Sequence, residues 1–215
     1  MNYRISAATD IGIVKTTNQD SFNVKVFDTK IGKIVFAILC DGMGGLEKGE
    51  VASSTVVNAY MEWSYTRLPL LCEEGITDSA IRNEWSMIAN DCNEKIKNYG
   101  NNLAIRLGTT LTAILVTDNR YYIINIGDTR VYEVAAEMSI LTRDQTVVAR
   151  EVEEGILTEE EAKTDSRRSV LLQCVGASDN VYPDMYFGNA KKTLHFCFVV
   201  MALGMKFLMR KFITI

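Results

Sequence analysis

The chain has 215 residues, of which 47% are hydrophobic and 23% charged, and its formal net charge is -4. These values are typical of one globular domain with a sizeable core, and they exclude a disordered or fibrous chain. A mildly acidic chain without a basic block is poorly suited to nucleic acid, so no nucleic-acid partner is expected. The N-terminus opens into a polar, strand-like segment, and neither a signal peptide nor a membrane partner is expected.

The cysteines and the histidine limit the chemistry further. Five cysteines without a C-x-x-C pair are most simply explained as reduced thiols of a cytoplasmic protein. The single histidine, His195, argues against a Ser-His-Asp hydrolase and against a multi-histidine zinc or iron site. We favour a core or strand position for it over the role of a lone ligand. Any bound metal is therefore expected to have mainly oxygen ligands, which suits Mg²⁺ or Mn²⁺.

The first half of the chain predicts strands followed by two long helices. The strand-like runs are Tyr3–Ala8, Phe22–Phe27 and Lys33–Cys40. Apolar residues then recur with helical spacing over Gly49–Arg67 and Thr77–Tyr99.

The second half predicts more strands and two short helices. The expected strands are Thr109–Thr117 and Tyr121–Ile126, which form a hairpin, and then Val131–Val134, Ser139–Leu141, Ser169–Cys174 and Met185–Gly188. A short helix is expected over Asp144–Glu153, and Thr158 with Glu161 forms the capping box of another. This order indicates antiparallel sheets with helices packed outside them, an α+β architecture in a single domain over residues 1–215.

The most informative segment follows the apolar run Ile34–Leu39. It ends on Asp41, and three glycines lie within the next four positions. A carboxylate at the end of a buried strand is costly unless something positive neutralises it, and glycines let the backbone approach a ligand closely. These residues suggest a metal ion held by Asp41 and a neighbouring carbonyl, although an ordinary Asp-Gly turn suits them as well. A phosphate-cradling loop fits poorly, since the glycine spacing is not G-x-G-x-x-G.

Two more acids lie where a strand meets a loop. Asp20 precedes the second strand and Asp128 follows the strand Tyr121–Ile126. Each alone could be a turn or a cap, but if the sheets bring Asp20, Asp41 and Asp128 together, the cluster would bind cations. Two hard cations bridged by one carboxylate can polarise a phosphoryl oxygen and turn a bound water into a nucleophile.

Taken together, the motifs resemble metal-dependent protein phosphatases of the PPM (type 2C) class, in their compact bacterial form. The resemblance covers roughly residues 5 to 190, and its motifs occur in the family's order. The matching segments are 9–12, 18–22, Asp41–Gly45, Gly108–Thr110, Gly127–Arg130, Leu141–Gln145 and Val170–Gly176. The resemblance implies a four-layer α-β-β-α sandwich of two antiparallel sheets flanked by helices. It also implies hydrolysis of phosphoserine or phosphothreonine by a metal-activated water, without a covalent enzyme intermediate.

Carried over by position, the resemblance assigns the site residues. Asp41 would bridge two Mn²⁺ or Mg²⁺ ions, and the Gly42 carbonyl would bind one of them. Asp20 would hold a metal directly or through water, and Asp128 would serve a third, weaker site. Lys15 stands where the family usually has an arginine that grips the substrate phosphate, so weaker substrate binding is expected.

Two other positions depart from the family pattern. Gln19 stands where an acid is common, and Gln145 replaces a frequent histidine. The segment from about 155 to 178 matches the mobile flap beside the site. The resemblance further implies a signalling enzyme that acts on phosphorylated proteins, alongside a Ser/Thr kinase, and we expect a monomer.

The largest departure is in the tail, residues 197–215. The resemblance requires a Ser-Asp-Gly motif after a late strand and an Asp-Asn pair near the end, whose aspartates bind metal. No acid follows Phe196 in this chain. Permitted codons for the tail, read one step out of frame, can encode Phe-Cys-Ser-Asp-Gly-Phe-Gly-His-Glu-Ile-Ser-Asp-Glu-Lys. We therefore favour a frameshift product over a genuine apolar strand with a basic end. A membrane anchor ranks last, because the apolar run is shorter than the ~20 residues needed to span a bilayer.

Two functions follow from these observations. The first is an active protein serine/threonine phosphatase. The alternative is a catalytically impaired phosphatase-like domain or fragment, with an incomplete C-terminal part, that acts at most as a binding module.

Overall fold

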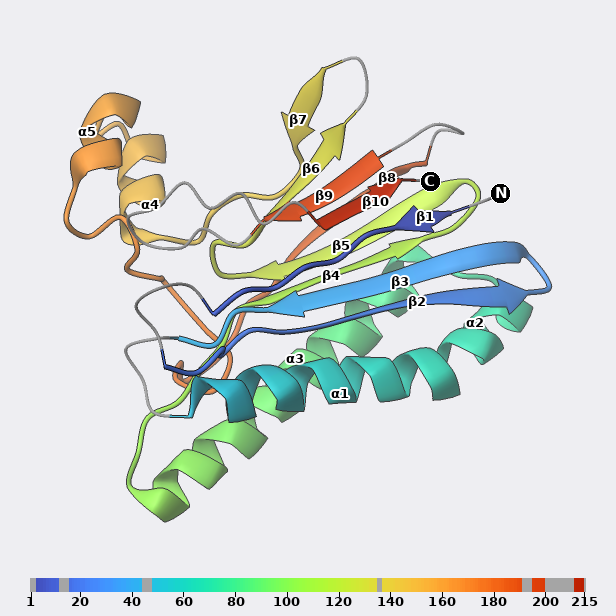
Figure 1. Ribbon diagram of the computed structural model, residues 1–215, viewed down its shortest axis with the longest axis horizontal. Helices are drawn as coiled ribbons and strands as arrows, with labels where there is room; N and C mark the ends of the chain where they lie inside the picture. The colour runs from blue at the N-terminus through green and yellow to red at the C-terminus, as the bar shows by residue number, and fades with distance from the viewer. Residues whose placement is uncertain are drawn as a thin grey trace.

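Two five-stranded antiparallel sheets lie face to face in the computed structural model, which describes residues 3–11, 16–43, 48–134, 137–190, 195–199 and 211–214 (Figure 1). The first sheet has the order β2 (Ser21–Thr29), β3 (Gly32–Cys40), β4 (Leu111–Val116), β5 (Arg120–Ile126) and β8 (Asp184–Asn189). The second sheet has the order β1 (Arg4–Ile5), β10 (Lys211–Thr214), β9 (His195–Val199), β6 (Arg130–Val134) and β7 (Met138–Ile140).

Three helices cover the outer face of the first sheet (Figure 1). They are α1 (Gly49–Thr66), α2 (Leu68–Glu74) and α3 (Asp78–Leu103). Two short helices, α4 (Val147–Glu153) and α5 (Glu159–Thr164), lie beyond one end of the sheets. The outer face of the second sheet carries no helix from the described part of the chain, so three layers of the expected four-layer sandwich are seen.

β3 explains why the apolar run before Asp41 does not alternate. Ile34, Phe36 and Ile38 pack into the core between the first sheet and its helices. The intervening residues, Val35, Ala37 and Leu39, pack into the core between the two sheets. Because both faces of the strand are buried, every position from 34 to 40 is apolar, and the strand is held on two sides.

The elements follow the sequence-based predictions closely, with three differences. The first strand is shorter than expected, since only Arg4 and Ile5 pair with another strand. α2 was not predicted, because it follows α1 directly and carries a proline in its first turn. The strand expected over Ser169–Cys174 is wrong: this segment forms isolated bridges and turns, as its backbone bonds irregular loops instead of a neighbouring strand.

Other predictions are confirmed in detail. The hairpin of β4 and β5 pairs as expected, and the Thr158–Glu161 capping box begins α5. His195 begins a strand, β9.

In the tail, Lys211–Thr214 forms a strand that pairs with β9, and residues 200–210 lie outside the described ranges. Among the helices that the structure describes, none combines the length and apolar character that a membrane crossing requires.

Candidate functional site

The register of the β2–β3 hairpin brings Asp20 and Asp41 to the same edge of the first sheet. Ser21 pairs with Cys40, so the two acids occupy the next position on neighbouring antiparallel strands. The backbone N–H of Asp20 donates to the Asn18 side-chain oxygen at 3.0 Å, which fixes the turn into β2. Neighbouring strands lie about 4.8 Å apart, so both carboxylates start from adjacent backbones.

The backbone of Gly42 is packed so closely against its neighbours that there is no room for a side chain. Its N–H donates to the Gln19 carbonyl at 3.1 Å. A Cβ at this position would lie 2.4 Å from the Gln19 oxygen and 2.6 Å from the Gly49 oxygen. The segment before β2, the segment after β3 and the start of α1 are therefore packed backbone against backbone. The absence of a side chain at Gly42 is therefore used for contact between protein segments, and the close approach of this loop to a ligand stays a prediction.

Two threonines join the Asp41 segment to the Asp128 loop. The Asp41 N–H donates to Thr110 Oγ1 at 2.9 Å, and the Thr110 N–H donates to the Asp41 carbonyl at 2.9 Å. Thr110 Oγ1 lies 3.2 Å from Thr129 Oγ1. Thr129 follows Asp128 directly, so the third predicted acid lies at the same edge, two strands away from Asp41.

Asp128 lies in surroundings that favour a bound cation. Burial, and after it the nearby charge of Asp144, raise the pKa of its carboxyl from 3.8 to about 6. Arg130 opposes this effect only in part, because its guanidinium binds Asp144, with 2.6 Å between Nη2 and Oδ2 and 2.8 Å between Nε and Oδ1. A divalent cation beside Asp128 would supply the missing positive charge.

The structure aligns the three acids along an edge and does not gather them at one point. Within the described ranges, no three side chains of His, Cys, Asp or Glu form a set that could hold a metal. The physical reason is the spacing of the strands, since Asp20, Asp41 and Asp128 leave from β2, β3 and β5. The donors that are present, carboxylates and the carbonyl region of a tightly packed Gly42, are hard oxygen ligands and fit Mg²⁺ or Mn²⁺. Lys15 lies outside the described residues, as do Gly44 and Gly45.

Sequence reasoning gave Gln145 little weight, yet this residue connects the site to the flap. Its backbone N–H donates to the Gly127 carbonyl at 2.9 Å, and its Oε1 accepts from the Gly127 N–H at 3.0 Å and from Gln173 Nε2 at 2.9 Å. Its Nε2 donates to Asp184 Oδ2 at 2.9 Å and to the Asn125 carbonyl at 3.4 Å. The buried amide is therefore fully hydrogen-bonded, and it holds the residue beside Asp128. The buried environment, which no sequence pattern reveals, is what makes this glutamine important.

The flap expected at about 155 to 178 contains α5 and the loop that returns to the core. Arg167 closes it with a bidentate contact to Glu151 on α4, at 2.7 and 2.8 Å, and a further contact to Asp165 at 2.8 Å. The returning chain then bonds the core, since the Leu172 N–H donates to the Gln145 carbonyl at 2.8 Å. The end of the flap and the Asp128 loop thus share one residue, Gln145.

Comparison with known proteins gives a consistent result. The family model of protein phosphatase 2C matches residues 13–174. The chain is 34% identical over 185 residues to a putative protein phosphatase 2C-type of Streptococcus pyogenes serotype M6, covering 85% of this chain and 71% of that protein. It is 35% identical over 175 residues to the serine/threonine protein phosphatase PstP of Mycobacterium tuberculosis, covering 80% of this chain and 31% of PstP.

Solved structures show the same fold. The serine/threonine phosphatase of S. agalactiae is 30% identical, with a TM-score of 0.78, over 92% of this chain and 78% of that one. The catalytic domain of PstP, solved in complex with two manganese ions, is 28% identical, with a TM-score of 0.69, over 91% of this chain and 76% of that one.

Proposed function

Because the chain belongs to the protein phosphatase 2C family, we propose that the edge formed by Asp20, Asp41 and Asp128 is the catalytic centre of a protein serine/threonine phosphatase. The observation that carries this assignment is the register of Ser21 with Cys40, which sets Asp20 beside Asp41 at the end of a buried hairpin. Phosphorylated serine and threonine side chains of proteins are the proposed substrates.

The proposed ligands of the metal ions are oxygen atoms. Asp41 and the Gly42 carbonyl would hold the ions together with Asp20, and Asp128 would hold a further one. A donor set of carboxylates and a carbonyl favours Mn²⁺ or Mg²⁺, and the relative PstP has been solved with two manganese ions. The chemistry that such ions supply when bound is polarisation of the phosphoryl group and activation of water.

The chain's own residues would orient this centre. Thr110 fixes the backbone of Asp41 from both sides, and Asn18 fixes that of Asp20. Because these contacts are made to backbone groups of Asp20 and Asp41, they fix the position from which each carboxylate extends. Lys15 is proposed to bind the substrate phosphate by its charge, on the strength of the family resemblance.

The test is hydrolysis of p-nitrophenyl phosphate by the 215-residue chain with and without Mn²⁺. We expect Mn²⁺-dependent activity that falls at least about a hundredfold in Asp41→Asn, because the variant keeps the shape and loses the charge that holds the metal. Asp91→Asn, an exposed acid on α3, is the matched control and should keep full activity. Equal activity in wild type and Asp41→Asn would contradict the assignment.

The alternative function, an impaired phosphatase-like domain, is favoured by two observations. The described residues offer no set of three metal-binding side chains, and the tail lacks the expected aspartates. The proposed frameshift accounts for the missing aspartates. A version of the chain with the shifted frame restored, assayed beside the 215-residue chain, separates the two functions: activity in the restored version alone would establish impairment, and equal activity would contradict the frameshift.

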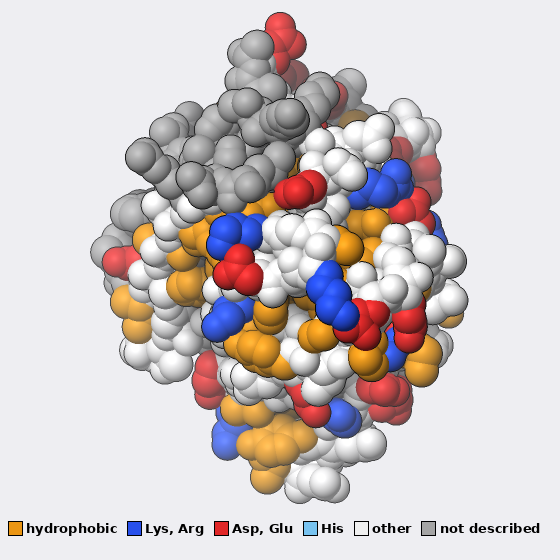
Figure 2. All heavy atoms as spheres, turned by 90° about the vertical axis from the view of Figure 1, so that its right-hand side faces the viewer, with side chains coloured by type: hydrophobic (Ala, Val, Ile, Leu, Met, Phe, Trp, Pro, Cys, Tyr) orange, Lys and Arg blue, Asp and Glu red, His pale blue; other side chains and the backbone are white. Residues whose placement is uncertain are grey.

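Partners and location remain part of the proposal. We propose a bacterial cytoplasmic signalling enzyme, active as a monomer alongside a Ser/Thr kinase. The five free cysteines, all buried, support a reducing compartment. On the face shown in Figure 2, Lys and Arg side chains lie interspersed with Asp and Glu, which supports the expectation of no nucleic-acid partner. Size-exclusion chromatography with light scattering tests the monomer.

A further inference from the structure

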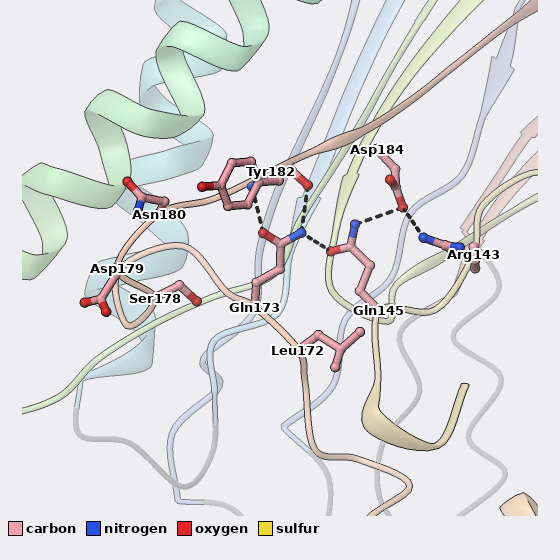
Figure 3. A pocket seen from close by; sticks show the side chains of 9 residues that line it. All are labelled: Arg143, Gln145, Leu172, Gln173, Ser178, Asp179, Asn180, Tyr182 and Asp184. Carbon is pink, nitrogen blue, oxygen red and sulfur yellow. Dashed lines mark hydrogen bonds and ion pairs between the residues drawn. The ribbon is translucent and has the colours of Figure 1, made fainter. Parts of the chain in front are cut away.

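A cavity of about 650 Å³ lies beside the Asp128 loop and has no role in the proposed hydrolysis. Its lining comes from the loop before α4, the end of the flap, the loop after it and the start of β8 (Figure 3). The lining residues are Arg143, Gln145, Leu172, Gln173, Ser178, Asp179, Asn180, Tyr182 and Asp184. Gln145 is both part of this lining and the hydrogen-bond partner of Gly127, the residue before Asp128.

The walls of the cavity are fixed by hydrogen bonds to the backbone. Gln173 accepts from the Tyr182 N–H at 2.7 Å and donates to the Tyr182 carbonyl at 2.7 Å. On the other side, Asn93 of α3 donates to the Ser178 carbonyl at 3.1 Å, and Lys97 donates to the Asp179 carbonyl at 3.1 Å. A cavity with walls held in this way is preformed, as ligand sites usually are.

Tyr182 presents its ring to solvent from this rigid frame. Tyr182 is 73% exposed, although its backbone N–H and C=O are both hydrogen-bonded to the Gln173 side chain. Exposed aromatic rings on a fixed backbone are favoured contact residues, because binding immobilises little that is not already ordered. The face of a tyrosine ring also attracts cations.

Most charged groups at the cavity are paired, including Lys97, whose Nζ lies 3.2 Å from Glu94 Oε1. Arg143 is engaged by Glu153 at 3.0 Å and faces Asp184 at 3.7 Å, and Asp184 also accepts from Gln145. The carboxylate of Asp179 makes no hydrogen bond or ion pair with another described residue, and it is exposed at the rim. The cavity is therefore lined by the unpaired carboxylate of Asp179, the exposed ring of Tyr182 and Arg143, whose charge is neutralised by its acidic partners (Figure 3).

We propose that this cavity is a subsite for a basic side chain, arginine or lysine, in the peptide that flanks the phosphorylated residue of the substrate. The basic group would stack on Tyr182 and pair with Asp179, while the phosphorylated side chain reaches the edge of Asp41 and Asp128. This inference rests on the proposed phosphatase function and adds a substrate class to it: phosphoproteins with a basic residue near the phosphorylated serine or threonine.

The experiment compares a phosphopeptide series with a small substrate on the full chain. The peptides carry one arginine at each position near the phosphothreonine in turn, with glutamate at the same positions as the reverse series. We expect kcat/KM to rise about fivefold for arginine at one position and to fall for glutamate there, with the difference shrinking at high salt. In Asp179→Asn and in Tyr182→Leu the arginine preference should disappear, while hydrolysis of p-nitrophenyl phosphate stays unchanged.

Asp91→Asn is the matched control, since it removes one exposed acid elsewhere and should keep the arginine preference. A flat series in the wild type, or a preference that survives in Asp179→Asn, would overturn the proposal. If the chain hydrolyses neither substrate, the proposed function fails, and the same peptides are then measured by fluorescence anisotropy. Binding that favours arginine only when Asp179 is present would retain the subsite, and binding without preference would remove it.

Discussion

The side-chain oxygen of Gln145 accepts a hydrogen bond from the backbone N–H of Gly127 at 3.0 Å, and the Gln145 N–H donates to the Gly127 carbonyl at 2.9 Å. The residue immediately before Asp128 is thus held on both of its peptide groups by one glutamine. Because the same glutamine binds Asp184 and the end of the flap, a change at this position should reach the Asp128 loop.

Gln145→Glu tests this connection. In the wild type, Gln145 Nε2 donates to Asp184 Oδ2. The carboxylate of the variant keeps an acceptor for the Gly127 N–H, but it replaces this donor with a second negative oxygen facing Asp184. We expect Mn²⁺ affinity, measured by calorimetry, to fall about tenfold, because the repulsion displaces the loop. In the double variant Gln145→Glu/Asp184→Asn the donor and acceptor are exchanged and the net charge is restored, so affinity should recover. A variant that loses only thermal stability, with Mn²⁺ affinity intact, would show that Gln145 has no positioning role.

The pKa of Asp128 predicts a dependence of stability on pH. The folded-state value of about 6 lies above the ordinary 3.8, so the folded state binds more protons between these values. The free energy of unfolding therefore decreases as pH rises through this window, and above it the ionised carboxylate is a penalty. Without metal at pH 7.5, Asp128→Asn should be more stable than wild type by about 1–3 kcal/mol, and the gain should vanish near pH 4.

Thermal unfolding in a chelator measures this difference. Asp91→Asn, which removes an exposed acid, should show no such gain at either pH. A destabilised Asp128→Asn in metal-free buffer at pH 7.5 would contradict the raised pKa. Added Mn²⁺ should reverse the order of stability, since only the wild type keeps the carboxylate.

Gly42→Ala tests the close packing beside Asp41. The added Cβ would lie 2.4 Å from the Gln19 oxygen, and a backbone atom cannot move aside cheaply. We expect a loss of about 3 kcal/mol or more in unfolding free energy. Gly49→Ala is a graded comparison and should cost less, because its Cβ would lie no closer than 3.0 Å to the Gln19 side chain and to the backbone carbon of Gly42. Chemical denaturation measures the unfolding free energy of both variants. An equal loss in the two would mean that the close backbone contact at Gly42 does not cause the destabilisation.

Arg167 is expected to hold the flap without supporting the rest of the fold. In Arg167→Lys the positive charge remains, but the bidentate hydrogen bonding to Glu151 is lost. Hydrogen exchange of the amides at 165–170 should speed up about tenfold, while the global unfolding free energy changes by less than about 1 kcal/mol. Arg150→Lys serves as the control, because Arg150 approaches Glu154 only at 3.9 Å. Unchanged exchange at 165–170 would show that the contact does not hold the flap.

The sequence predicted the sheets, the two long helices and the family, because these depend on local periodicity and on short motifs. The sequence indicated only that Asp20 and Asp41 lie where strands meet loops, and the register of β2 with β3 places them at neighbouring positions. Two features could not be predicted for physical reasons. The importance of Gln145 depends on partners from distant segments, Gly127, Gln173 and Asp184, and the irregular course of Ser169–Cys174 depends on its bonds to loops. The metal ligands Asp20, Asp41, Gly42 and Asp128, and the role of Lys15 as the phosphate contact, stay predictions.

The nine consecutive pairs of the β2–β3 hairpin, from Thr29 with Gly32 to Ser21 with Cys40, also limit how relatives of this chain can differ in length. Side chains alternate between the two faces of a sheet, so one inserted residue in either strand would turn its remaining side chains to the opposite face. It would also displace Asp20 against Asp41. Between these two acids, insertions in homologues are therefore expected as a larger loop at Lys30 and Ile31, or as two residues added to both strands at matching positions.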